Sequence, residues 1–305
     1  MLSEKNRTSR RVAVTGGSGY LGGRVAARLL ADGWEVISLA RRPIGLPGVH
    51  HERFELGKRL DPASLAGVNA LVHCAWDFSQ RTWTDIEAVN VRGTQALFET
   101  ASSCGIERTV HISTVSASGS PRSMYGRAKL LTEGFAREHG GTVVRPGLVY
   151  GQGAGGMVGM LAALVRLLPT IPVLVGANRP LYLAHQDDLV ELMALLAGGE
   201  VGETGGRPIV AAGPDPHSLR DVLATIAAME GRRRVFFRIP WQPIYVALRA
   251  MELVRLPPPM RSDSALSIAT LDPNPFGSGI VPEGVSFRVF EAAALAADPG
   301  RAAAP

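Results

Sequence analysis

The sequence contains little cysteine: Cys74 and Cys104 are the only two among 305 residues. Neither lies at a spacing typical of a metal site. His185, Asp187 and Asp188 resemble a ligand set, but their spacing fits the capping of a helix better, so no metal is expected. A small number of isolated thiols is typical of a reducing compartment, where disulfides are rare. We therefore predict a cytoplasmic protein with buried or incidental thiols.

Long apolar runs are also missing. The most apolar window, residues 157–177, is interrupted by Arg166 and by two prolines, Pro169 and Pro172, so no membrane-spanning helix is expected. The basic first residues lack the apolar stretch that is typical of a secretory signal. These absences predict a soluble protein.

A strong excess of one charge is absent too. The net charge is +5, of which residues 1–11 contribute +3, leaving +2 for the remainder. Such a small surplus argues against nucleic acid as a partner. Charged residues make up 19% of the chain and apolar residues 46%, which indicates a sizeable core and excludes global disorder.

Strand-like and helix-like segments alternate through the first half of the chain. This alternation predicts an α/β fold, a Rossmann-type doubly wound parallel sheet with helices on both faces. After residue 151 the rhythm changes, and we expect a smaller C-terminal α/β region that binds the substrate. The predicted parts are a flexible basic tail over 1–10, a dinucleotide-binding domain over 11–150, a mixed substrate-binding region over 151–291 and a flexible tail over 292–305.

A glycine-rich turn lies between the first expected strand, 11–15, and the first expected helix, 20–32. Gly16, Gly19 and Gly22 follow the G-x-x-G-x-x-G spacing. In this context glycines allow a tight turn, close approach of the backbone to a pyrophosphate, and close packing of the helix on the strand. The helix N-terminus also offers free N–H groups to phosphates. We predict that these glycines, with Tyr20 and Leu21, bind a dinucleotide; a glycine-rich turn without a ligand is the alternative.

The second expected strand, 34–40, is followed by two arginines, Arg41 and Arg42. A site that prefers NAD usually has a carboxylate here to bind the ribose 2′-hydroxyl, and Ala40 occupies that position instead. A guanidinium group can bind a 2′-phosphate in a bidentate manner. We therefore predict that both arginines bind the cofactor and that NADP is preferred over NAD. A solvated arginine pair in a loop is the alternative.

A second group of residues has the character of an acid–base site. Tyr125 and Lys129 are four residues apart on an expected helix, 123–138, and therefore share one face. An ammonium near a phenol lowers the pKa of the phenol, which favours general acid–base catalysis near neutral pH. A hydroxyl from a preceding strand end would complete the set, and Ser113 and Thr114 are the two candidates.

Together these motifs resemble an extended short-chain dehydrogenase/reductase of the NAD-dependent epimerase/dehydratase family. The resemblance runs from residue 11 to about residue 190. Its segments are TGGSGYLG at 15–22, HCAW at 73–76, NVRGTQAL at 90–97, HISTVSASG at 111–119, YGRAK at 125–129, RPGLVYGQG at 145–153 and HQDD at 185–188. The set is specific for the superfamily and carries little information about the substrate.

The resemblance implies catalytic roles. Tyr125 would be the general acid/base, and Lys129 would bind the nicotinamide ribose and tune Tyr125. The family's catalytic hydroxyl, counted back from Gly119, corresponds to Thr114, with Ser113 as the second choice.

The resemblance also implies further cofactor contacts. Ala75 and Trp76 would lie under the adenine-side ribose and pyrophosphate, and Pro146 and Val149 would line the nicotinamide. Asn90 would have a structural or relay role. Trp76 departs from the family pattern, because an indole replaces a small residue at the mouth of the site.

These observations predict an NADP(H)-dependent oxidoreductase that reduces a carbonyl, with a small-molecule carbonyl or alcohol as its substrate. A 4-keto nucleotide sugar is one candidate, and Arg145, Arg166 or Arg179 would then meet its diphosphate. Two alternatives are a nucleotide-sugar epimerase or dehydratase that retains NAD(P), and a non-catalytic NADP-sensing module. The resemblance favours a homodimer formed through the helices expected at 84–104 and 123–138.

Overall fold

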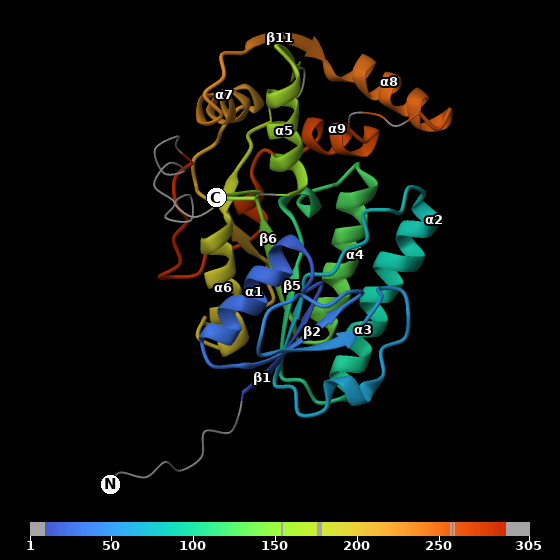
Figure 1. Cartoon of the computed structure of the whole chain (residues 1–305), viewed down its shortest axis with the longest axis vertical. Coiled ribbons are helices and arrows are strands. Elements are labelled where there is room, and N and C mark those ends of the chain that lie inside the picture. Colours follow the sequence, from blue (N-terminus) through green and yellow to red (C-terminus); the bar gives the residue numbers. More distant parts are fainter. Residues whose placement is uncertain (1–9, 154, 176–178, 257, 259, 291–305) are drawn as a thin grey trace. The chain divides into compact units, whose positions relative to one another are not determined.

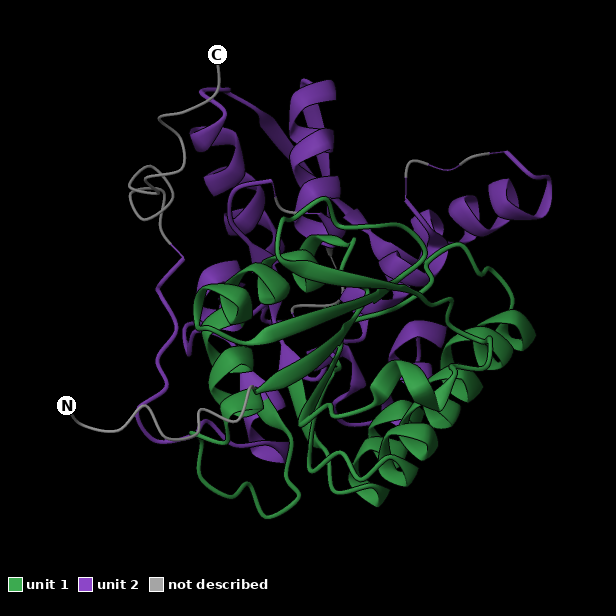
Figure 2. Ribbon diagram, turned by 60° about the horizontal axis from the view of Figure 1, so that its bottom comes forward, with its two compact units in different colours: residues 1–113, 131–144, 190–209 green, residues 114–130, 145–189, 210–305 purple. Residues whose placement is uncertain are grey.

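The computed structural model describes residues 10–153, 155–175, 179–256, 258 and 260–290, and it comprises two compact units (Figure 2). Unit 1 takes in residues 1–113, 131–144 and 190–209, and unit 2 takes in residues 114–130, 145–189 and 210–305. The units thus interleave along the sequence, and the predicted domain boundaries stay a prediction. Apart from Arg10, the predicted tails at 1–10 and 292–305 lie outside the described residues.

A seven-stranded sheet has the strand order β10-β6-β5-β4-β1-β2-β3. Figure 1 labels four of its strands, β1, β2, β5 and β6. Neighbouring strands from β6 to β3 pair in parallel. This order is that of a Rossmann-type doubly wound sheet, which confirms the predicted fold class. The strands are β1 (Arg11–Thr15), β2 (Glu35–Ala40), β3 (Val49–Arg53), β4 (Ala70–His73), β5 (Arg108–Ile112), β6 (Thr142–Pro146) and β10 (Ile209–Ala211).

The helices begin and end at local signals in the sequence. Helix α1 ends just before Gly33, whose φ of +81° reverses the chain into β2. Asp61 accepts a hydrogen bond from the N–H of Ala63 and so caps a short 3-10 turn that opens with Pro62. The helices are α1 (Tyr20–Ala31), α2 (Trp83–Ile86), α3 (Arg92–Ser103), α4 (Met124–Glu138), α5 (Gly156–Leu167), α6 (Gln186–Gly198), α7 (Leu219–Met229), α8 (Trp241–Leu253) and α9 (Ser262–Ala269).

The core of unit 1 includes apolar side chains from the sheet and from helix α3. Leu39, Leu71 and Phe98 are almost completely buried in it. All three lie in segments with the apolar pattern expected of buried strands and an amphipathic helix. This packing holds the carboxyl ends of β1, β2 and β4 in a fixed register.

Unit 2 contains two short parallel sheets, β7 (Leu148–Tyr150) with β9 (Leu183–His185), and β8 (Thr170–Val175) with β11 (Val235–Pro240). Its core includes Tyr150, Ile171 and Leu183. Strands β7 and β8 and helix α9 were not expected from the sequence. The short apolar runs of these segments have no clear period, so tertiary packing decides their conformation.

Two expectations about helices need correction. The helix expected at 84–104 is interrupted by one turn of π-helix, Glu87–Val91, between α2 and α3. The apolar spacing at 244–254 also predicts a helix, with packing in the core, a substrate lid or a dimer face as its interpretations, and this helix corresponds to α8. Only Leu248 of α8 is buried, and Val246 and Leu253 are more than 60% exposed, so α8 is not a core helix.

Candidate functional site

The loop after β1, residues 16–19, has the geometry of a phosphate cradle; we call it the glycine loop. Gly16 has a φ of +70°, which L side chains rarely adopt. A Cβ on Gly22 would lie 2.4 Å from the carbonyl oxygen of Gly16, so only glycine allows α1 to pack this closely. Gly19 is the N-cap of α1 and makes no side-chain capping bond. The first turn of α1, which begins at Tyr20 and Leu21, therefore presents backbone N–H groups suited to an anion.

The loop after β4 lies beside the glycine loop within unit 1. β1 pairs with β2 on one side and β4 on the other, so the strand order reverses here, where α/β sheets bind ligands. A Cβ on Gly16 would lie 3.0 Å from backbone atoms of Ala75, which shows how closely the two loops approach. The structure thus brings together the glycines and Ala75, as expected. Trp76 follows Ala75 and is partly buried.

Thr15 and His73 hold the two loops in place. The Oγ1 atom of Thr15 accepts the N–H groups of Cys74 and Ala75, both at 3.1 Å. His73 bonds Thr15 Oγ1 through Nδ1 at 2.7 Å and Thr94 Oγ1 through Nε2 at 3.0 Å. Because His73 is buried and both ring nitrogens have partners, it orients the β4 loop.

Asn90 holds the next residues of the β4 loop. It lies in the π-helical turn, and its Oδ1 accepts the N–H of Asp77 at 2.7 Å while its Nδ2 donates to the carbonyl oxygen of Asp77 at 3.1 Å. The Asn90 side chain therefore satisfies both backbone polar groups of Asp77, as a neighbouring strand would. This is a structural role, one of the two that the resemblance implied.

Arg41 and Arg42 are exposed and follow the end of β2 in unit 1. The pKa of Asp77 lies below its ordinary value. Burial opposes this shift, which is produced by hydrogen bonds from Ser79 and Gln80 and by the charge of Arg41. Asp77 is thus an acidic neighbour of Arg41 that sequence analysis missed, since 36 positions separate the two residues. The arginine pair retains a net positive charge.

The candidate catalytic residues Thr114 and Tyr125 lie in unit 2. Burial raises the pKa of the Tyr125 phenol from 10.0 to about 12, and a hydrogen bond with the Thr114 side chain acts in the opposite direction. The sequence predicted that the Lys129 ammonium lowers the pKa of the Tyr125 phenol. This prediction is wrong for this structure, because burial raises that pKa by more than the hydrogen bond with Thr114 lowers it. Lys129 is buried one turn further along α4. At neutral pH the phenol is therefore protonated and in contact with the hydroxyl predicted to assist it.

Ser113, the second candidate for the catalytic hydroxyl, is engaged elsewhere. Its Oγ donates to Glu133 Oε1 at 2.6 Å, and both side chains are buried in unit 1. The geometry thus distinguishes two adjacent hydroxyls that the sequence left open. Thr114 is the one that meets the tyrosine.

The N-terminus of the tyrosine helix has a cap that sequence analysis missed. Asp263 of α9 accepts the N–H of Met124 at 2.7 Å and the N–H of Tyr125 at 3.1 Å. Gly126 allows α4 to approach the preceding loop, since a Cβ there would lie 2.4 Å from the carbonyl oxygen of Ser116. The distance of Asp263 along the chain leaves no local signal for this contact.

Pro146 and Val149, predicted to line the nicotinamide, also lie in unit 2. Pro146 ends β6 and is buried, and Val149 pairs with Ala184 of β9. Among the three arginines suggested for a diphosphate, Arg145 is buried and donates to Ser118 Oγ and Ser278 Oγ at 3.2 and 3.0 Å.

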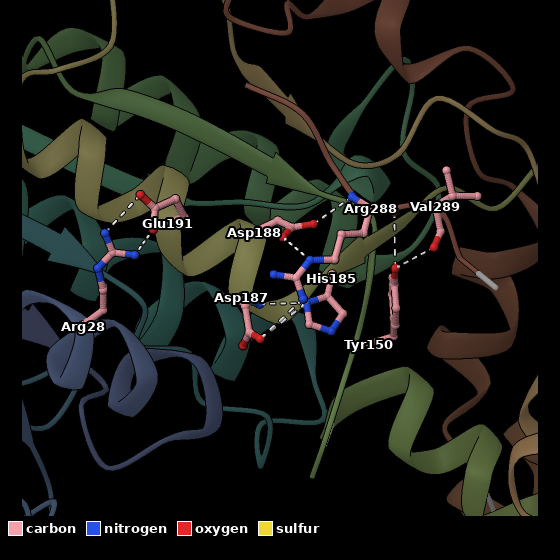
Figure 3. Close-up of polar contacts among 8 residues, drawn as sticks. All are labelled: Arg28, Tyr150, His185, Asp187, Asp188, Glu191, Arg288 and Val289. Atoms are coloured by element: carbon pink, nitrogen blue, oxygen red, sulfur yellow. Dashed lines mark hydrogen bonds and ion pairs between the residues drawn. The ribbon is translucent and has the colours of Figure 1, made fainter. Parts of the chain in front are cut away.

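A polar cluster at the start of α6 comprises His185, Asp187, Asp188, Arg288 and Tyr150 (Figure 3). Arg288 Nε lies 2.9 Å from Asp188 Oδ1, and Arg288 Nη1 lies 3.1 Å from His185 Nδ1. Tyr150 donates to the carbonyl oxygens of Arg288 and Val289. Burial, and then the charge of Asp188, raise the pKa of Tyr150 to about 12. The ion pair between Arg288 and Asp188 therefore holds the segment around Arg288 against the start of α6.

Also in Figure 3, Arg28 of α1 donates through Nη2 to Glu191 Oε1 of α6 at 3.0 Å, within unit 1.

Within the described part of the chain, every helix is too short or too polar to cross a lipid bilayer.

Comparison with known proteins gives a family and several relatives. The family described as "NAD dependent epimerase/dehydratase family" matches residues 12–207. The chain is 29% identical over 191 residues to ceramide reductase from Caulobacter vibrioides, an alignment that covers 60% of each protein. It is 34% identical over 183 residues to dTDP-6-deoxy-L-talose 4-dehydrogenase (NAD(P)(+)) from Kitasatospora kifunensis, covering 50% of this chain and 57% of that protein. The chain thus spans little more than half the length of these curated relatives.

Solved structures with the same fold include MoeE5 in complex with UDP-glucuronic acid and NAD. It superposes with a TM-score of 0.65 at 22% identity, covering 76% of this chain and 86% of MoeE5. At this identity the match establishes the fold.

Proposed function

Because the chain belongs to the NAD dependent epimerase/dehydratase family, we propose that it is an oxidoreductase that reduces a carbonyl group of a small molecule with NADP(H). The observation that carries the proposal is the hydrogen bond between the Tyr125 phenol and the Thr114 side chain. This pair offers two hydroxyls to one carbonyl oxygen, and Lys129 follows on the same helix.

The glycine loop fits the cofactor on its geometry. The turn at Gly16, the close packing at Gly22 and the uncapped start of α1 together form a cradle for a pyrophosphate. Arg41 and Arg42 would hold the 2′-phosphate that distinguishes NADP from NAD, because their guanidinium groups are exposed and positively charged. When bound, the nicotinamide supplies the hydride that is added to the carbonyl carbon.

The proposed roles of the chain's own residues follow from their protonation and contacts. Thr114 and Tyr125 hydrogen-bond the carbonyl oxygen and stabilise the charge that develops on it. Tyr125 then donates its proton to this oxygen, which yields the alcohol. A pKa of about 12 keeps the phenol protonated at neutral pH, the form required for reduction. The Lys129 ammonium favours the phenolate left behind until solvent returns the proton.

The names of the relatives support redox chemistry at a carbon–oxygen bond. The names ceramide reductase and dTDP-6-deoxy-L-talose 4-dehydrogenase both denote oxidation or reduction of the substrate. Their substrates differ in kind, a lipid and a nucleotide sugar. The shared element is therefore the reaction.

The decisive experiment combines nucleotide analysis with an assay. The nucleotide released on denaturation of the purified protein is identified, and carbonyl-dependent oxidation of NADPH and NADH is followed by absorbance. We expect little retained nucleotide, net consumption of NADPH, and loss of turnover in Tyr125→Phe with unchanged NADPH affinity. Turnover retained by Tyr125→Phe would overturn the mechanism.

The same measurement addresses the two alternatives. Stoichiometric, tightly held NAD⁺ without net consumption would indicate an epimerase or dehydratase that oxidises and reduces its cofactor within one cycle. Binding of NADP with no turnover of any carbonyl would indicate a sensing module. We also propose a cytoplasmic homodimer, for which light scattering gives the mass in solution.

A further inference from the structure

Unit 2 contains a hollow lined by Thr114, whose empty space of about 440 Å³ includes open solvent. It lies between the short loop after β5 and helix α9. The residues that line it include Thr114, Ser116, Tyr182 and Ser267, which carry hydroxyl groups. The hydroxyls of Ser116 and Ser267 are 3.1 Å apart, so α9 is joined to the loop that carries the candidate catalytic residue.

The wall of the hollow is mainly apolar. Apolar residues that line it include Leu148 of β7, Met157 of α5, Leu181 before β9, and Ile268 and Leu271 at α9. An apolar ligand gains affinity here in proportion to the area it buries, about threefold to fourfold for each methylene group. The wall therefore favours a substrate with an apolar body.

The charge of the residues that line the hollow also favours an uncharged substrate. Among the described residues that line it, Asp272 is the only one charged at neutral pH, and its charge is negative. A diphosphate would lose its hydration and meet a like charge, which disfavours it strongly. Asp272 Oδ1 accepts the N–H of Asn274, which holds the carboxylate in place. A hydroxyl or amide N–H of a substrate could donate to the same carboxylate.

The arginines considered for a diphosphate are not part of the wall. Arg145 is buried and donates to two serine hydroxyls, and Arg166 pairs with Glu230 at 2.9 Å. Arg179 is exposed and does not line the hollow. Redirecting Arg145 would leave those hydroxyls without their donor and would cost the contacts it already makes.

We propose that this hollow binds the apolar body of an uncharged carbonyl substrate, such as a ketone on a long alkyl or aromatic frame, and that it excludes nucleotide diphosphates. The carbonyl oxygen lies at Thr114, and the apolar part lies against Met157 and Leu271. The inference rests on the proposed reductase function and specifies its substrate class. Met157 is a specificity-determining residue in this arrangement.

The test uses the full chain, NADPH and a series of methyl ketones, 2-butanone, 2-hexanone and 2-octanone. We expect kcat/KM to rise by about threefold to fourfold per added methylene until the hollow is filled. Addition of 1 mM UDP at saturating NADPH should leave kcat/KM for 2-octanone unchanged. A flat dependence on chain length, or UDP inhibition that is competitive with the ketone, would overturn the substrate class.

Two methionines on the same helix provide a matched control. Met157 and Met160 both pack against the core of unit 2, but only Met157 of the two lines the hollow. Met157→Ala should lower kcat/KM for 2-octanone about tenfold relative to 2-butanone, and Met160→Ala should leave that ratio unchanged. Equal effects of the two variants would contradict the role of Met157.

A binding measurement separates this inference from the proposed reaction. The NADPH-loaded protein is titrated with 2-octanol, the alcohol product, by calorimetry. Saturable binding that Met157→Ala weakens supports the substrate class, even if no ketone is reduced and the reaction is therefore wrong. Reduction of ketones without preference for the apolar members leaves the reaction intact and overturns the substrate class.

Discussion

The carboxylate of Asp263 accepts the backbone N–H of Tyr125 at 3.1 Å, although 138 positions separate the two residues. Its other oxygen accepts the N–H of Met124 at 2.7 Å. The first N–H groups of a helix have no partner within the helix, and a negative charge beside them is favourable. Helix α9 therefore fixes the start of the helix that carries the candidate acid–base residue, and it also lines the hollow beside Thr114.

Loss of this cap should affect the position of Tyr125. Asp263→Ala should lower the free energy of unfolding by about 1–2 kcal/mol and should lower kcat more than it raises KM. Asp263→Asn, which keeps one acceptor oxygen, should recover part of both losses. Chemical denaturation and steady-state kinetics on the three proteins measure these effects. An Asp263→Ala protein with unchanged kcat would show that the cap serves stability alone.

The two adjacent hydroxyls should behave differently when removed. Thr114→Ala should reduce kcat about 100-fold because one hydrogen bond to the reacting oxygen is lost, and Thr114→Ser should restore much of the rate. Ser113→Ala should reduce the free energy of unfolding by about 1–3 kcal/mol, since it removes a hydrogen bond from the buried Glu133. Its kcat, measured on folded protein, should change little. The reverse pattern would assign catalysis to Ser113.

Two of the five tyrosines should titrate abnormally. The pKa values of Tyr125 and Tyr150 are both raised to about 12, mainly by burial. Because the unfolded chain releases these protons near pH 10 and the folded chain near pH 12, the folded state loses stability as pH rises through this interval. Below pH 10 both phenols stay protonated in either state, and no such dependence is expected.

Absorbance at 295 nm during an alkaline titration measures the ionisation. Tyr125→Phe and Tyr150→Phe should each remove one of the late-titrating groups. If either variant instead removes a group that titrates near pH 10, the environment assigned to that phenol is wrong.

The arginine pair should determine the cofactor. Arg41→Asp combined with Arg42→Ala should lower the ratio of kcat/KM for NADPH to that for NADH by about 10-fold to 100-fold, because charge-assisted bonds to a 2′-phosphate are lost. The same change at another exposed pair, Arg232→Ala with Arg233→Asp, is the matched control and should leave the ratio unchanged. An unchanged ratio in the first variant would refute the preference for NADP.

Much of the fold could be predicted because its signals are local. The apolar runs of β1, β2 and β4, the glycine turn and the cap at Asp61 each involve residues within a few positions of one another. The limits of these predictions also have physical causes. The helix expected at 84–104 keeps its period overall, but the π-turn that places Asn90 against Asp77 depends on a loop 13 residues away. The apolar pattern of helix α9 is weak, and its contacts with other elements, such as those of Asp263 with the start of α4, stabilise it.

The candidate site likewise has features that local spacing predicts and features that depend on tertiary contacts. The doubly wound fold, the glycine loop and the Tyr125–Lys129 pair follow from residue spacing, because spacing along a strand or helix decides which residues share a face. Tertiary packing, in contrast, brings Thr114 to Tyr125 and Ser113 to Glu133. It also places Asp263 at the N-terminus of the tyrosine helix and leaves arginine out of the wall of the hollow. These relationships depend on contacts between distant segments and on burial, which residue spacing does not encode.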